Sequence, residues 1–130
     1  MGRAIIISLD HDATGHSASL SAAYATGVFE VITEGTRKQF KPTEQGCLRA
    51  CFLRLDEEFQ EYINLDEISA ECFNVFVRAC ESGLANYQAT GTTAWGFKQE
   101  EAWVHSNTLE WSELIKKLHA DPRYELARLP

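Results

Sequence analysis

A change in the period of the apolar residues at Thr43 constrains the fold of this chain more than any other feature. After Thr43, apolar residues recur at spacings of three and four, which is the pattern of an amphipathic helix. These residues are Leu48, Cys51, Phe52, Leu55, Phe59, Tyr62 and Ile63. We therefore expect a helix over residues 43–63. A strand over residues 47–55 is the competing interpretation, because residues with high β propensity crowd there.

Two further helices are expected downstream. Asp66 is a suitable N-cap for a helix over residues 66–87. The apolar arc of that helix covers about half of its circumference, so we expect it at the centre of the core. Thr108 is the expected cap of a last helix over residues 108–120, which the dipeptide Asp121-Pro122 would end.

Three segments are expected to form a sheet. Residues 3–9 are an apolar, β-branched run typical of a buried strand, and residues 28–33 have the same character. Residues 95–105 fit a hairpin or two short strands, whereas residues 17–24 are either a short helix or a loop. The sequence thus predicts an α+β fold, a single domain over residues 1–130, with a small, mostly antiparallel sheet packed against three helices.

Charge is distributed unevenly along the chain, whose formal net charge is -7. The segment between Leu55 and Val77 contains seven acidic residues and neither Lys nor Arg. Such a surface repels polyanions and attracts basic partners. Nucleic-acid binding is not expected, because it gains its affinity from a basic footprint. The alternative is that the acids only keep the fold soluble.

Five of these acids are the candidate partner-binding residues. They are Glu57, Glu58, Glu61, Glu67 and Glu71. We expect them on the outer faces of two adjacent helices, where they would form one rigid negative surface. Small inhibitors use such surfaces to cover basic active sites with fast electrostatic steering. We therefore interpret the chain as a non-enzymatic binding protein of the inhibitor, immunity or antitoxin type. Its partner would be a basic protein such as a nuclease toxin, with no cofactor.

The alternative interpretation is enzymatic and rests on the segment Asp10-His11-Asp12-Ala13-Thr14, which directly follows the first apolar run. The pattern Asp-x-Asp-x-Thr after a buried strand resembles the first motif of haloacid-dehalogenase-type phosphatases. The resemblance implies a metal-dependent phosphohydrolase, with Asp10 as nucleophile and Asp12 as general acid/base and Mg²⁺ contact. The later Lys and the late acid pair of that family have no counterpart here. A solvated turn after a strand explains the same residues.

Metal binding is not predicted from the remaining candidates. Asp10, His11, Asp12 and His16 offer suitable ligands, but their spacing matches no strong metal motif. The four cysteines lack the tight pairs that a zinc site requires. We expect all four to be free thiols packed in the core of a protein in a reducing compartment. They are Cys47, Cys51, Cys72 and Cys80.

An aromatic cluster near the C-terminal end could line a ligand pocket, although we expect it to belong to the core. It consists of Trp95, Phe97, Trp103 and Trp111.

The location is expected to be cytoplasmic, without a membrane partner. Arg3 precedes only a short apolar run, which is unlike a secretory signal. No stretch of the sequence reaches the length of a membrane span.

Overall fold

The computed structural model describes residues 3–11 and 17–126 and confirms an α+β fold. Strands β1 (Arg3–His11), β2 (Ser17–Tyr24) and β3 (Tyr62–Asn64) form one sheet in the order β2-β1-β3. β1 pairs antiparallel with β2 and parallel with β3. The sheet is therefore mixed, with most of its paired residues antiparallel, as the sequence predicts.

One face of the sheet contributes to the hydrophobic core. Ile5 and Ile7 of β1 are fully buried, as is Ile63 of β3, whereas Ala23 on the other face of β2 is exposed. This alternation is the period of two that strands impose on their side chains. The register between β1 and β2 shifts at Ile7, so β1 contains a bulge there.

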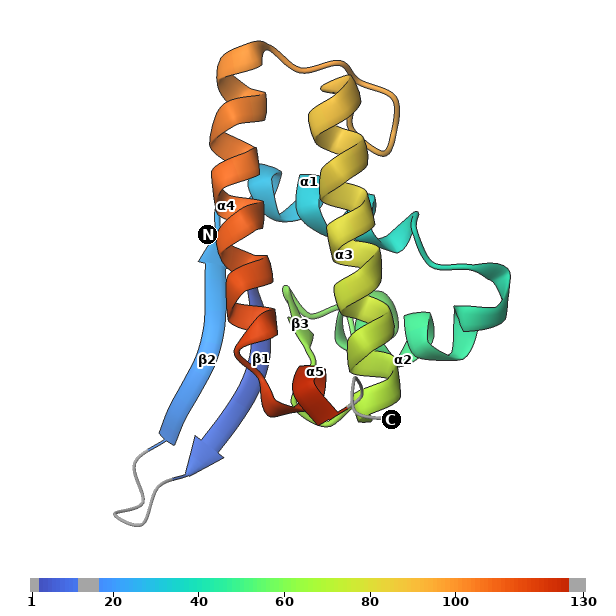
Figure 1. Ribbon diagram of the computed structural model, residues 1–130, viewed down its shortest axis with the longest axis vertical. Helices are drawn as coiled ribbons and strands as arrows, with labels where there is room; N and C mark the ends of the chain where they lie inside the picture. Colours follow the sequence, from blue (N-terminus) through green and yellow to red (C-terminus); the bar gives the residue numbers. More distant parts are fainter. Residues whose placement is uncertain (1–2, 12–16, 127–130) are drawn as a thin grey trace.

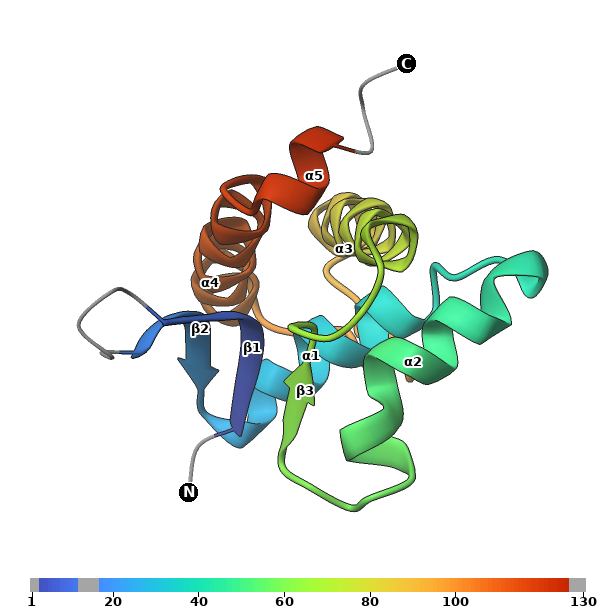
Figure 2. The ribbon, with the colours of Figure 1, turned by 90° about the horizontal axis from the view of Figure 1, so that it is seen from below.

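Within residues 3–11 and 17–126, five helices and one short 3₁₀ turn complete the fold. They are α1 (Thr26–Arg37), the 3₁₀ turn η1 (Pro42–Glu44), α2 (Gln45–Asp56), α3 (Ala70–Thr90), α4 (Glu101–His119) and α5 (Pro122–Leu126). α3 contacts α1, α2, α4 and α5 and is thus the central helix, as expected. Figures 1 and 2 show α3 with α4 on one side and α2 on the other; α1 crosses behind α3 in Figure 1.

Local signals fix both ends of α3. The hydroxyl of Ser69 accepts a hydrogen bond of 3.1 Å from the backbone N–H of Cys72, which makes Ser69 the N-cap. Gly91 ends the helix in the left-handed conformation, with φ of 66°, which glycine adopts without steric cost. The predicted start at Asp66 is thus four residues early. The N–H of Asp66 instead donates to Oδ1 of Asn64 in a turn.

α1 and α3 cross where two glycines and a tryptophan meet. A Cβ atom on Gly83 would lie 2.8 Å from the carbonyl oxygen of Gly35 and 2.9 Å from the ring of Trp111. The indole N–H of Trp111 donates a 3.0 Å hydrogen bond to the carbonyl oxygen of Cys80. The absence of side chains on the two glycines therefore allows the close approach of the two helices.

Two predicted strand segments are helical or irregular. Residues 28–33 belong to α1, where Phe29, Ile32, Thr33 and Thr36 are buried on one face at helical spacing. Packing of this face against α3 and the sheet overrides the β propensity of the branched residues. Residues 95–105 form no strand of the sheet: an isolated antiparallel bridge joins Thr92 to Lys98, and the chain enters α4 at Glu101.

The extents of two predicted helices also differ from the structure. The helix expected over residues 43–63 ends at Asp56, and Tyr62–Asn64 becomes β3. Pairing of these residues with β1 buries Ile63 completely, which favours the strand over further helix. The last helix begins at Glu101 and not at Thr108. Residues 17–24, for which helix and loop were the alternatives, form β2.

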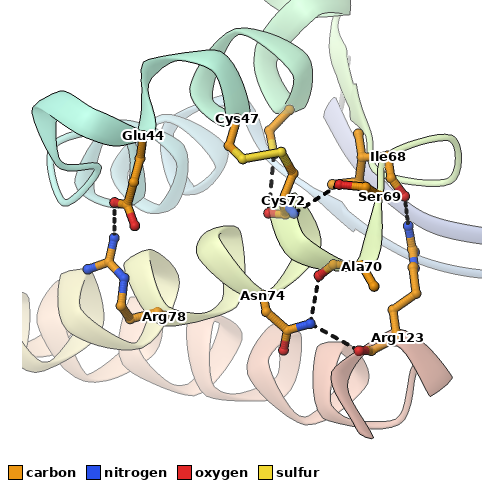
Figure 3. Close-up of a disulfide and its surroundings, with 10 residues drawn as sticks. Glu44, Cys47, Ile68, Ser69, Ala70, Cys72, Asn74, Arg78 and Arg123 are labelled. Atoms are coloured by element: carbon orange, nitrogen blue, oxygen red, sulfur yellow. Dashed lines mark hydrogen bonds and ion pairs between the residues drawn. A yellow bond between two sulfur atoms is a disulfide. The ribbon is translucent and has the colours of Figure 1, made fainter. Parts of the chain in front are cut away.

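The prediction of four free thiols is wrong, because two of the cysteines form a disulfide. Cys47 of α2 and Cys72 of α3 form a disulfide across a sequence separation of 25 (Figure 3). Cys51 and Cys80 are free and buried, and burial raises the pKa of each thiol to about 12, so both stay protonated at neutral pH.

The disulfide bears on the expected location of the protein. Disulfides persist mainly in oxidising compartments, so a cytoplasmic location stays an expectation. Among residues 3–11 and 17–126, no helix has both the length and the apolar character that crossing a bilayer requires.

Candidate partner-binding surface

Four of the five predicted acids lie outside the two helices on whose outer faces the sequence predicts them. Because α2 ends at Asp56, Glu57, Glu58 and Glu61 occupy the turn between α2 and β3, at the lower edge of Figure 2. Glu67 precedes α3, and Glu71 stands in the first turn of that helix. We call these five residues the acidic surface; all five are exposed.

Two arginines of α2 neutralise part of the acidic surface. Arg49 donates two hydrogen bonds, of 2.8 and 2.9 Å, to the carboxylate of Glu57. The hydrogen bonds from Arg49 lower the pKa of Glu57 below its ordinary value. Arg54 lies 2.7 Å from Glu58 and 3.7 Å from Glu67, so it joins the turn to the start of α3.

The acidic surface nevertheless remains negative. Its five carboxylates face two guanidinium groups, which leaves an excess of three negative charges. Within the described part of the chain, Glu61 and Glu71 have no ion-pair partner. Exposed ion pairs contribute at most about 1 kcal/mol each, so the paired acids can exchange their arginines for cations of a partner at low cost.

Phe59 stands in the middle of the acidic turn and is the most unusual residue of the surface. Its side chain is 86% exposed, and its φ of 54° lies in the left-handed region that bulky residues rarely adopt. Such a conformation costs on the order of 1–3 kcal/mol and is found mainly at functional sites. The helical spacing of the apolar residues predicts Phe59 on the buried arc of a helix, and this prediction is wrong. The two acids before Phe59 and Glu61 after it are the sequence signal that indicates an exposed position.

A second group of aromatic side chains is exposed between α3 and α4. Trp95, Phe97 and Trp103 are 47%, 67% and 58% exposed, and only Trp111 of the predicted cluster is buried in the core. The expectation that the whole cluster belongs to the core is therefore wrong for three of its four members. Gly96, with φ of 94°, lies between the first two and gives the loop its sharp bend.

Trp95 borders several neighbouring hollows on the outer side of α1. One, of about 270 Å³, extends to Leu55 and Asp56 and so reaches the base of the acidic turn. Another, of about 350 Å³, lies between the start of α1 and α4 and has Trp95 and Trp103 among its walls. Trp95 therefore lies across the first hollow from the end of α2, where the acidic turn begins.

The alternative catalytic site falls largely outside the described residues. Asp12 and His16 lie there, and only the backbone of Asp10 and His11, at the end of β1, is described. The phosphohydrolase interpretation thus stays a prediction. Among the residues that the structure describes, no group of three or more His, Cys, Asp and Glu side chains is arranged to hold a metal ion.

Comparison with known proteins bears on the fold. No protein-family model and no curated protein matches this chain. Among solved structures, the chain is similar to one chain of "CdiA-CT toxin from Burkholderia pseudomallei E479 in complex with cognate CdiI immunity protein". The TM-score is 0.67 at 18% identity, over 93% of this chain and 97% of the other. At that identity the similarity establishes a shared fold and not a shared function.

Proposed function

We propose that this chain is a non-enzymatic binding protein of the immunity type, which neutralises a basic toxin domain by covering it. The observation that carries the proposal is Phe59, an exposed aromatic in a costly backbone conformation, set among acids in excess. The shared fold with a chain of a toxin–immunity complex supports this class of function. The net charge of -7 argues against the opposite role, a toxin that acts on nucleic acid.

The acids and the aromatic would contribute in different ways. The carboxylates attract a basic partner over distances of about the Debye length, roughly 8 Å at physiological ionic strength, and so raise the association rate. Phe59 then supplies the apolar anchor that holds the complex together, because buried aromatics dominate the energy of protein interfaces. The hollow that begins at Asp56 continues the contact towards Trp95.

The first prediction concerns the charges of the acidic surface. The double variant Glu58→Lys with Glu61→Lys should bind the partner with an association rate constant lowered about tenfold at low salt, because steering is lost. The rate should also depend less steeply on salt. The partner to test is a basic toxin domain encoded beside the gene of this chain, where one is present, and surface-based kinetics over a salt series measures both quantities.

A matched control distinguishes the effect of the acidic surface on the association rate from the effect of net charge alone. Glu110 and Glu113 are exposed on α4, which lies on the opposite side of α3 from α2. The double variant Glu110→Lys with Glu113→Lys makes the same change in net charge and should alter the association rate by less than about threefold. Equal effects of the two double variants would show that the acidic surface has no special part in binding.

The second prediction concerns Phe59: its replacement should weaken partner binding without lowering the stability of the fold. Phe59→Gly removes the strained φ, so the free energy of unfolding should stay equal or rise by up to about 1 kcal/mol. The same variant should weaken partner binding about tenfold, because the anchor is lost. Phe59→Asn, which also tolerates the left-handed region, should behave alike. Denaturant titration and the binding assay measure the two effects; a destabilised variant with unchanged affinity would contradict the proposed role.

A further inference from the structure

We propose that the cavity between the start of α1 and α4, with Trp95 and Trp103 in its walls, binds a cationic side chain, Lys or Arg, presented by a protein partner. The inference extends the proposed function, because a basic partner supplies such side chains. It concerns a separate site and is tested separately. The cavity has a volume of about 350 Å³, which falls in the range of ligand pockets and accommodates one long side chain.

The walls of the cavity offer the surfaces that organic cations prefer. Trp95 and Trp103 line it and are 47% and 58% exposed, so part of each indole is accessible to a ligand. A guanidinium or ammonium group within about 6 Å of an indole ring is attracted by the ring quadrupole. Val28 and Val31 of α1 also line the cavity and provide apolar contact for the methylene groups of the same side chain.

A buried amide in the lining has an acceptor that no donor satisfies. Asn107 is 1% exposed, and its Nδ2 donates to the hydroxyl of Tyr87 at 3.1 Å and to Oε1 of Gln99 at 3.2 Å. Tyr87 donates in turn to the same oxygen of Gln99. These bonds hold the amide of Asn107 in one orientation, while its Oδ1 has no hydrogen-bond partner within the described part of the chain. A buried unsatisfied acceptor is unfavourable, and a ligand donor that displaced the side chains covering this oxygen would relieve that cost.

The charge of the cavity also selects a cation. Glu30 is the single charged residue among the described residues that line it. Its ion pair with Arg3 spans 3.7 Å, which is longer than a hydrogen bond, and its side chain is half exposed. Glu30 is therefore available to a stronger cationic partner. Aromatic walls, an unsatisfied oxygen and one carboxylate together match a Lys or Arg side chain.

The experiment uses a peptide probe with the full chain. The chain is titrated with acetyl-Gly-Arg-Gly-amide and, in parallel, with the peptide in which neutral citrulline replaces arginine. NMR correlation spectra report the indole N–H signals of the three tryptophans. We expect the Trp95 and Trp103 signals to shift and saturate with a dissociation constant on the order of 1 mM for the arginine peptide. Trp111, buried and bonded to Cys80, is the internal reference and should not respond.

Three variants test the assignment. Trp103→Ala and Glu30→Gln should each weaken binding of the arginine peptide about fivefold. Leu109→Ala, at an exposed position of the same helix outside the cavity lining, should leave it unchanged. Absence of saturation, an equal response to citrulline, or an unchanged affinity of Glu30→Gln would overturn the inference. The peptide assay involves no toxin domain, so failure of the proposed function at the acidic surface would be seen separately.

Discussion

Replacing Arg123 by alanine should lower the free energy of unfolding by about 3–5 kcal/mol, the usual cost of removing one partner of a buried ion pair. Arg123 follows the C-terminal end of α4 and is 17% exposed. Its guanidinium donates to the carbonyl oxygens of Ile7 at 2.8 Å and Ile68 at 3.1 Å, and to that of Leu65. It also stacks 4.1 Å from the ring centroid of Phe73.

The same guanidinium is the partner of a buried carboxylate. Asp121 is 3% exposed and accepts hydrogen bonds of 3.0 Å from Nε and Nη2 of Arg123. The Arg123 side chain therefore joins three parts of the chain: β1, the turn before α3, and α5. Figure 3 draws the hydrogen bond to Ile68. In Arg123→Ala the three carbonyl oxygens lose their guanidinium donors and Asp121 loses its ion-pair partner, while the backbone N–H of residue 123 still donates to Oδ1 of Asp121. The loss of these contacts together explains the large expected effect.

The effect should depend on pH in a defined direction. Burial alone would raise the pKa of Asp121, but the hydrogen bonds from Arg123 outweigh it and hold the pKa below its ordinary value of 3.8. A group with a depressed pKa stabilises the fold above its unfolded pKa, and this contribution is lost as pH falls through the folded pKa. The deficit of Arg123→Ala should therefore be full at neutral pH and should shrink below about pH 4.

Denaturant titrations at neutral and acidic pH measure this prediction. Arg49→Ala is the matched control, because Arg49 is 75% exposed and its main partner is Glu57. Its loss should change the free energy of unfolding only slightly, because exposed ion pairs contribute little to stability. A loss in Arg123→Ala no larger than that of the control would contradict the role assigned to Arg123.

Gly83→Ala should lower the free energy of unfolding by about 2 kcal/mol, even though alanine favours helix over glycine by about 1 kcal/mol. The new methyl group would lie 2.8 Å from the backbone oxygen of Gly35 and 2.9 Å from the ring of Trp111. Neither neighbour can yield easily, because one is main chain and the other is a fully buried indole. α1 and α3 would have to move apart.

Gly46→Ala is the control for helix propensity and should have the opposite sign. Gly46 is in α2, and a Cβ atom there would meet nothing within 4 Å. This variant should gain about 0.5–1 kcal/mol. Thermal or denaturant unfolding of both variants measures the contrast. A gain in stability for Gly83→Ala would show that the crossing of the two helices is looser than the structure indicates.

The fold was predictable from the sequence where hydrophobic period and length agreed. α3 shows a helical period over several turns, so both its existence and its central position were expected correctly. The sequence predicts a strand over residues 28–33, within α1, because this segment contains the β-branched residues Val28, Val31 and Ile32. Burial of one face against α3 decides its conformation, and that contact is not a local property.

The candidate site was predictable in composition but not in geometry. The excess of acids after Leu55 identified a negative surface. Because α2 ends at Asp56, three of these acids lie on a turn and not on a helix. For the same reason Phe59 is exposed, whereas the sequence predicts it in the core. The pairing of Cys47 with Cys72 was missed, because the spacing of cysteines does not reveal which of them meet.

The Cys47–Cys72 bond has a topological consequence for the surface that carries the proposed function. All five acids and Phe59 lie between the two bonded cysteines, so the residues proposed to meet a partner belong to a covalent macrocycle. A closed loop of this length removes conformational freedom from the unfolded chain worth about 3 kcal/mol in the chain-entropy model. The covalent closure also limits the conformational entropy that this segment can lose on binding, so the cost of ordering it in a complex would be smaller. A single peptide-bond cut within the macrocycle would leave both fragments joined.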